Sequence, residues 1–143
     1  MKNNSVGKVL ELFIAKASKL NVNELSLDTS GVIDSKFYGK NIQRSVLLAS
    51  IDSYTLLREN NINIDYGQLG ENILTDFNPY DLEIGTQLKI GEVVLEISQQ
   101  CTLCKSLENL EQSIPKLLKD SRGIFAKVIK SGKIRKEDAL YIL

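Results

Sequence analysis

A chain of 143 residues is long enough to bury one hydrophobic core and too short for two ordinary domains, so we expect a single domain over residues 1–143. Hydrophobic residues make up 43% and charged residues 25%, with zero formal net charge, which is the balance of a soluble folded protein and excludes a disordered one. A neutral chain with scattered basic residues does not favour nucleic acid as a partner. The absence of histidine excludes a histidine-based catalytic triad and the usual zinc enzyme sites.

The N-terminal residues are polar and begin no long apolar run. We therefore expect no signal peptide, no transmembrane segment and no membrane partner. Two cysteines three positions apart are too few for a disulfide framework. Both observations indicate a cytoplasmic protein.

In the first half of the chain, apolar runs predict strands over Val6–Ile14, Leu20–Leu27 and Arg44–Ala49. The segment Gly31–Gln43 has two glycines and a Lys-Phe-Tyr group, which is typical of an exposed and functional loop. Ser50 is a suitable N-cap, and apolar residues at helical spacing after it predict a helix up to Asn60 and Asn61.

The second half begins with a brief predicted edge strand over Ile62–Asp65. Apolar residues leading to Ile90 and the alternation of Val93–Ile97 predict two strands joined by a tight turn at Gly91-Glu92. The remaining predicted elements are a helix from Cys104 to about Ser113 and strands over Ile124–Ile129 and Ala139–Leu143. Many short strands, glycine turns and two or three short helices favour a β-rich barrel over a βαβ sheet.

The two cysteines lie between the predicted strand Val93–Ile97 and the predicted helix that begins at Cys104, in the order Cys101, Thr102, Leu103, Cys104. Backbone N–H groups at a helix N-terminus lower a thiol pKa, so a reactive thiolate at Cys104 is one interpretation. A redox dithiol, a zinc site completed by carboxylates or a second chain, and two small buried hydrophobic residues are the alternatives.

Three further clusters offer positive charge and backbone donors to an anionic ligand. They are Lys36, Lys40 and Arg44 in the first loop, Gly70-Glu71-Asn72 in a glycine-rich turn, and Arg122-Gly123 before a strand. Each alone is typical of a solvated charge or a turn. We expect them to matter only if the fold brings them together.

Read in order, these stretches resemble the MOSC domain, the β-barrel module named for the C-terminal part of molybdenum-cofactor sulfurases. The matching pieces are the loop and strand Gly31–Leu48, the turn Gly67–Ile73, the segment Leu82–Gly91, Cys104 before a helix, Arg122-Gly123-Ile124, and a closing Gly132, Ile134 and Asp138. The resemblance covers roughly Val22 to Leu143. It implies a MOSC-type β-barrel whose pocket holds a molybdopterin-type cofactor or a sulfur group passing to or from it.

The resemblance also implies roles for single residues. Cys104 matches the family's cysteine, which is the molybdenum ligand in some members and a proposed persulfide carrier in others, and so is the catalytic and metal candidate. Arg44, Asn72 and Arg122 would grip the pterin and phosphate. Lys36, Cys101 and Thr102 are further cofactor-binding candidates, and Cys101, where many relatives have arginine, could resolve a Cys104 persulfide as a disulfide.

The leading hypothesis is therefore a domain that binds molybdenum cofactor or carries sulfur through Cys104. It would work with a separate sulfurtransferase or reductase, since the chain has no pyridoxal phosphate lysine motif and no flavin or iron–sulfur motif. The alternatives are a non-catalytic binding barrel with a degenerate site and a Cys-x-x-Cys thiol–disulfide oxidoreductase. Whether the protein is itself an enzyme stays open at this point.

Overall fold

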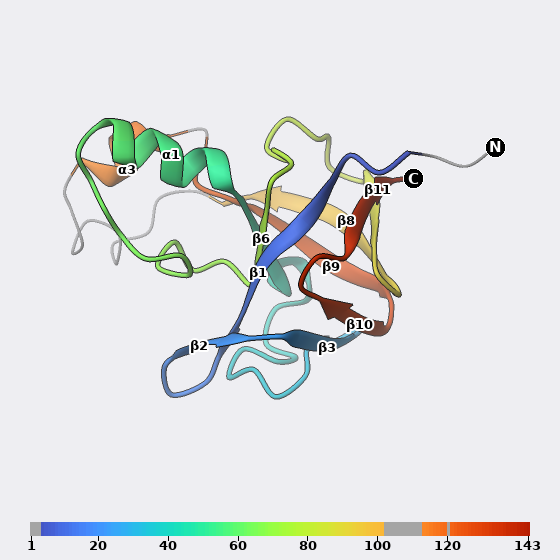
Figure 1. The fold of residues 1–143 in the computed structure, drawn as a ribbon. Coiled ribbons are helices and arrows are strands. Elements are labelled where there is room, and N and C mark those ends of the chain that lie inside the picture. Colours follow the sequence, from blue (N-terminus) through green and yellow to red (C-terminus); the bar gives the residue numbers. More distant parts are fainter. Residues whose placement is uncertain (1–3, 102–112, 120) are drawn as a thin grey trace.

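The computed structural model of the chain describes residues 4–101, 113–119 and 121–143 (Figure 1). Within these residues it has eleven strands: β1 (Gly7–Ala15), β2 (Lys19–Val22), β3 (Glu24–Asp28), β4 (Gly31–Val32), β5 (Val46–Ser50), β6 (Ile73–Thr75), β7 (Gln87–Ile90), β8 (Val93–Gln100), β9 (Ile124–Lys130), β10 (Gly132–Arg135) and β11 (Ala139–Ile142). Helices in the same residues are η1 (Ile42–Arg44, a 3₁₀ turn), α1 (Ile51–Glu59) and α3 (Ile114–Leu117).

Seven of the strands close into a barrel, in the order β1-β11-β7-β8-β9-β5-β6 and back to β1. The closure joins the two ends of the chain, because Gly7 and Lys8 pair with Leu140 and Ala139. β5 and β6 run parallel and the other pairs antiparallel, so the barrel is mixed. This confirms the predicted β-rich barrel.

Strand β1 is long enough to pair with three other strands, β6, β11 and β2. One edge pairs with β6, and the other pairs first with β11 and then, from Leu12 to Ala15, with β2. The three-stranded sheet β10-β3-β4 lies at the same end of the molecule as β2 (Figure 1). One core cluster joins both sheets, since Leu25 and Ile134 pack with Leu48, Leu95 and other buried barrel residues.

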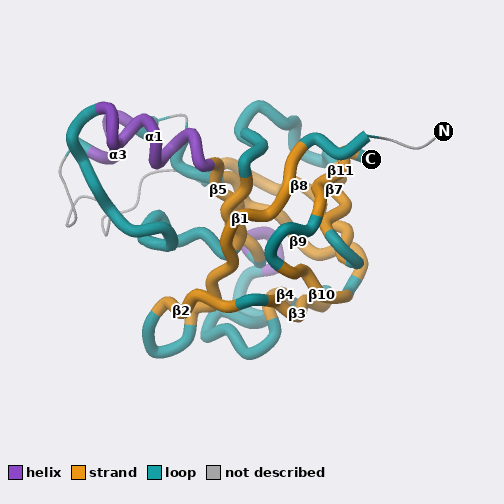
Figure 2. Tube along the Cα trace, in the orientation of Figure 1, coloured by secondary structure: helices purple, strands orange, loops and turns teal. Residues whose placement is uncertain are grey.

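Helices α1 and α3 lie together at one side of the barrel (Figure 2). α1 begins as predicted, because the Ser50 hydroxyl accepts a hydrogen bond from the Asp52 N–H at 3.0 Å. Tyr54 and Leu57 of α1 pack with Ile114 and Leu118 in a second buried cluster. This cluster covers the outer side of Leu74 in β6.

Several boundaries differ from the prediction. Leu20–Leu27 is two strands, β2 and β3, which separate at Asn23 and pair in different sheets. Ile62–Asp65 is not a strand; Ile62 and Ile64 instead pack against the cluster around Tyr54. β8 extends to Gln100 because it continues to pair with β9 through polar residues. Among the described residues, no helix is long and apolar enough to span a membrane.

Candidate functional site

A cavity of about 530 Å³ opens where segments from both halves of the chain meet. Its walls come from the hairpin between β1 and β2, the loop and 3₁₀ turn before β5, the turn before β6, the end of β8 and the start of β9. The lining side chains of interest are Lys19, Lys36, Lys40, Arg44, Asn72, Cys101, Arg122 and Phe125. None of the described residues that line it is acidic.

Five cationic side chains line this cavity in a chain whose formal net charge is zero. Lys19 is one of them, and its ammonium donates a hydrogen bond to the Gly70 carbonyl at 3.1 Å. Loss of surrounding water is the main cause that lowers the pKa of Lys19. The charges of Lys36 and Arg122 lower it further, while Glu71 opposes them. Such a concentration of positive charge is suited to an anionic ligand.

Arg122 is the most deeply placed of these cations. It precedes β9, and only 8% of the residue is exposed. Its Nε and Nη1 atoms are buried and have no hydrogen-bond partner within the described part of the chain. A buried charged group left unbonded is costly, so an acceptor supplied by a ligand would complete its hydrogen bonding.

The turn before β6 is built around a buried carboxylate. Glu71 Oε2 accepts hydrogen bonds from the Tyr54 hydroxyl at 2.6 Å and from the Gly67 N–H at 3.1 Å. Gly67 has φ +93°, and a Cβ there would stand 2.8 Å from the Phe13 ring, so only glycine fits. Burial raises the pKa of Glu71, and the hydrogen bond from Tyr54 opposes that rise. The result is a rigid turn that holds the Gly70 carbonyl towards Lys19.

Asn72 lines the cavity but its side chain is used within the protein. Oδ1 accepts from the Leu47 N–H at 3.0 Å, and Nδ2 donates to the Phe13 carbonyl at 3.3 Å. These bonds join β5 to β1 at the point where both border the cavity. They give Asn72 a supporting role in the wall, and its predicted contact with a pterin or phosphate stays a prediction.

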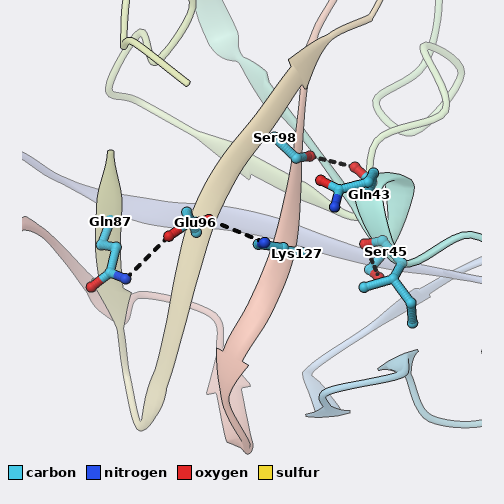
Figure 3. Close-up of polar contacts among 7 residues, drawn as sticks. Gln43, Ser45, Gln87, Glu96, Ser98 and Lys127 are labelled. Atoms are coloured by element: carbon cyan, nitrogen blue, oxygen red, sulfur yellow. Dashed lines mark hydrogen bonds and ion pairs between the residues drawn. The ribbon is translucent and has the colours of Figure 1, made fainter. Parts of the chain in front are cut away.

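Arg44 also lines the cavity, where it contacts Phe125. Its guanidinium carbon lies 4.5 Å from the centre of the Phe125 ring, which is a cation–π contact. The 3₁₀ turn that carries it is tied to the barrel because the Ser98 hydroxyl of β8 donates to the Gln43 carbonyl (Figure 3). In the same view Gln87 and Lys127 both bond to Glu96, which joins the strands on either side of β8.

Cys101 is buried, with 6% of its surface exposed, and packs with Leu47 and Phe125 in the cavity wall. A dithiol that exchanges with another protein needs accessible sulfur, so this burial does not favour the oxidoreductase alternative. Thr102 and Cys104 lie outside the described residues. Among the described residues there is no group of three or more histidine, cysteine, aspartate or glutamate side chains placed to hold a metal ion.

The fold thus brings five predicted site residues to one cavity: Lys36, Arg44, Asn72, Cys101 and Arg122. Lys40 of the first-loop cluster lines it as well. Sequence reasoning missed Lys19, because its position depends on the hairpin between β1 and β2 folding beside the turn that holds Gly70. It also missed the support from Tyr54, for which the only signal was a conventional apolar helix position.

The family described as "MOSC domain" matches residues 32–141. The YUAD protein from Bacillus subtilis is similar in structure, with a TM-score of 0.85 and 15% identity over 99% of this chain and 97% of that one. YiiM from Geobacillus stearothermophilus is similar with a TM-score of 0.73 and 15% identity, over 99% of this chain and 75% of that one. YiiM from Escherichia coli is similar with a TM-score of 0.72 and 20% identity, over 95% of this chain and 69% of that one. None of the curated proteins matches the chain.

Proposed function

Because the chain belongs to the MOSC domain family, we propose that its cationic cavity binds a molybdopterin-type ligand, either as molybdenum cofactor or as the acceptor of a transferred sulfur. The observation that carries this proposal is Arg122, a nearly buried cation in the cavity wall whose Nε and Nη1 are unbonded. A phosphate or another oxyanion would accept a charge-assisted hydrogen bond from such a donor.

The other cavity residues fit the same kind of ligand. Arg44 and Lys36 are exposed cations that would neutralise further negative charge nearer the mouth. Phe125 and Leu47 add apolar surface to the wall, as is usual in a pocket that takes an organic ligand. A bound molybdenum centre would supply oxygen-atom or sulfur chemistry, while this chain's cations bind and orient the anionic part of the ligand.

We assign the reacting thiolate to Cys104 on the strength of the family pattern. In a sulfur-carrier role, the Cys104 thiolate attacks the outer sulfur of a donor persulfide. A new S–S bond forms at Cys104 as the donor's S–S bond breaks, and the donor leaves as a thiolate, so no external oxidant or reductant is needed. In a cofactor-bearing role, the same thiolate is a soft ligand suited to molybdenum.

Sulfur or electrons come from a separate sulfurtransferase or reductase in this proposal. The cavity mouth suits such a partner, because Phe37 is 59% exposed there beside the cations Lys36 and Lys40. An apolar side chain ringed by positive charge fits an acidic partner surface with an apolar centre. Lowering the salt concentration should therefore speed the transfer.

The test is the metal and pterin content of protein purified without oxygen from a host that makes the cofactor. Wild-type protein should carry molybdenum and a fluorescent pterin together, and Arg122→Gln should lose both. Lys133→Gln is the matched control, since Lys133 is a half-exposed cation that pairs with Glu24 at 3.7 Å, and it should keep both. Wild-type protein without pterin would overturn the cofactor-bearing form of the proposal.

Sulfur carriage is tested by intact mass after incubation with a persulfide donor. The expected result is the gain of one sulfur atom, retained in Cys101→Ser and lost in Cys104→Ser. No adduct on wild-type protein, or an adduct that persists in Cys104→Ser, would contradict the sulfur-carrier form.

A further inference from the structure

A chain of buried hydroxyl groups runs beneath the wall that carries Arg122. The Ser50 N–H donates to the Tyr80 hydroxyl at 2.8 Å, the Tyr80 and Ser53 hydroxyls are 2.7 Å apart, and the Ser53 hydroxyl donates to the Ser121 carbonyl at 2.6 Å. Ser50 and Ser53 have no exposed surface, and Tyr80 is 5% exposed. We call these three bonds the Tyr80 relay.

The direction of each bond in the Tyr80 relay follows from its ends. A backbone N–H can only donate and a backbone carbonyl can only accept. Ser53 has a single hydroxyl hydrogen, which it donates in the hydrogen bond to the Ser121 carbonyl. The Tyr80 hydroxyl must therefore donate to Ser53, so the relay runs one way from Ser50 to Ser121. Bonds aligned in this way strengthen one another.

Tyr80 itself is fixed at three points. Its hydroxyl is in the relay, its N–H donates to the Asn78 side chain at 2.9 Å, and its carbonyl accepts from the Gln100 side chain at 2.8 Å. Burial is the main cause that raises the pKa of Tyr80, and the positive charge of Arg122 opposes it. The phenol is thus a neutral, immobile donor near Arg122.

The relay ends on the peptide group that leads into Arg122. The Ser121 carbonyl and the Arg122 N–H belong to one planar peptide, so holding the carbonyl fixes the backbone direction at Arg122. On the other side, the Gly123 carbonyl accepts from the Cys101 N–H at 3.1 Å. Arg122 is therefore held through its backbone, whereas Nε and Nη1 of its guanidinium have no bond within the described residues.

From this geometry we infer that Tyr80 and Ser53 are positioning residues for the anion site, aiming the guanidinium of Arg122 through the Ser121 carbonyl. The inference rests on the proposed function, since it assumes that the cavity takes an anion. Removal of the Ser53 hydroxyl breaks the bond to the Ser121 carbonyl, and removal of the Tyr80 hydroxyl takes away the donor that orients Ser53. Either change leaves the core packed but holds the peptide before Arg122 less firmly. The oxyanion then loses correctly oriented N–H donors of the guanidinium.

The first test is inorganic phosphate binding measured by calorimetry on the full chain. Tyr80→Phe and Ser53→Ala should each weaken binding about tenfold, because aligned hydrogen bonds to a charged group are worth at least that much. The double variant should be no weaker than either single variant, since both break the same relay. In an Arg122→Gln background, Tyr80→Phe should change the dissociation constant less than about twofold. Tyr141→Phe, a tyrosine outside the cavity lining, is the control and should bind as wild type.

A second readout separates the inference from the proposed function. The NMR resonance of the Arg122 Nε–H group should move in Tyr80→Phe and in Ser53→Ala, and stay in Tyr141→Phe, at temperatures where all variants are folded. If wild-type protein binds no phosphate, the proposed anion site is wrong, but the Arg122 Nε–H resonance still tests whether the relay positions Arg122. Any of three results would overturn the inference. They are an Arg122 resonance that does not move, losses of phosphate affinity that multiply in the double variant, and a tenfold loss of affinity from Tyr80→Phe in the Arg122→Gln background.

Discussion

Replacing Arg122 with methionine should make the ligand-free protein more stable. Arg122 is 8% exposed, and its buried Nε and Nη1 have no partner within the described residues. Methionine keeps a flexible apolar stem of similar length but removes the charge and the donors. The variant also relieves repulsion that now acts on Lys19. A residue kept for ligand binding at a cost in stability would behave in this way.

The size of the effect follows from the two unbonded donors. Each buried hydrogen-bonding group without a partner costs about 1–3 kcal/mol, so two at the lower end give an expected gain of about 2 kcal/mol. For a chain of this length that gain raises Tm by about 4–8 °C. With an m-value of about 2 kcal/mol/M it moves the urea midpoint up by about 1 M.

The assay is urea unfolding in a buffer free of phosphate and sulfate, with Arg122→Met compared with wild type and with Lys133→Met. The exposed Lys133 control should change the free energy of unfolding by less than about 0.5 kcal/mol. Added phosphate should then stabilise wild type and leave Arg122→Met unchanged. A loss of more than about 1 kcal/mol in ligand-free Arg122→Met would refute the reasoning, because it would mean that the protein itself satisfies the guanidinium.

Three further predictions concern the turn before β6 and its neighbours. Because the pKa of Glu71 is raised, the folded protein binds the Glu71 proton more tightly than the unfolded chain does. The contribution of this group to the free energy of unfolding is therefore fully present below about pH 4.5 and is lost as the pH rises through the pKa of the folded protein. Glu71→Gln should therefore flatten the fall of the urea midpoint above pH 4.5, and an unchanged slope would count against a buried carboxyl. Because the pKa of Lys19 is lowered, Lys19 loses its charge below the usual lysine value of 10.5, and phosphate affinity measured by calorimetry should begin to decline there as the pH rises. Lys19→Gln should remove that decline. A decline that persists in Lys19→Gln would mean that another group is titrating. Gly67→Ala should cost more than about 2 kcal/mol in urea unfolding because of the Phe13 ring, whereas Gly85→Ala, with a similar φ of +96° and open space, should cost about 1 kcal/mol; equal losses would exclude the clash.

The sequence predicted most of the barrel because its local patterns agree with the final structure. The alternation of Val93–Ile97 and the Ser50 cap are local signals, and both elements form where they were expected. β10 was missed because Gly132–Arg135 is short and its pairing with β3 is distant in the chain. Strand Ile62–Asp65 was predicted in error because its apolar residues serve a helix cluster instead of a sheet.

The site was predictable in its residues but not in their geometry. Motif order identified Arg44, Asn72 and Arg122, and the fold brings all three to one cavity. Their environments depend on partners far along the chain. An arginine before glycine is usually solvated, so the burial of Arg122 could not be read from its neighbours. The amide of Asn72 bonds to the backbone of β5 and β1, and no local pattern indicates such a bond.

The central claim is that the cavity is an oxyanion site with Arg122 at its base. The most direct test is a crystal soaked in tungstate, a tetrahedral oxyanion whose metal is located by anomalous scattering. We predict a tungsten peak inside the cavity, with a tungstate oxygen within hydrogen-bond distance of the Arg122 guanidinium, and no such peak in Arg122→Met. Tungstate bound only at other surface lysines, with the cavity empty, would contradict it.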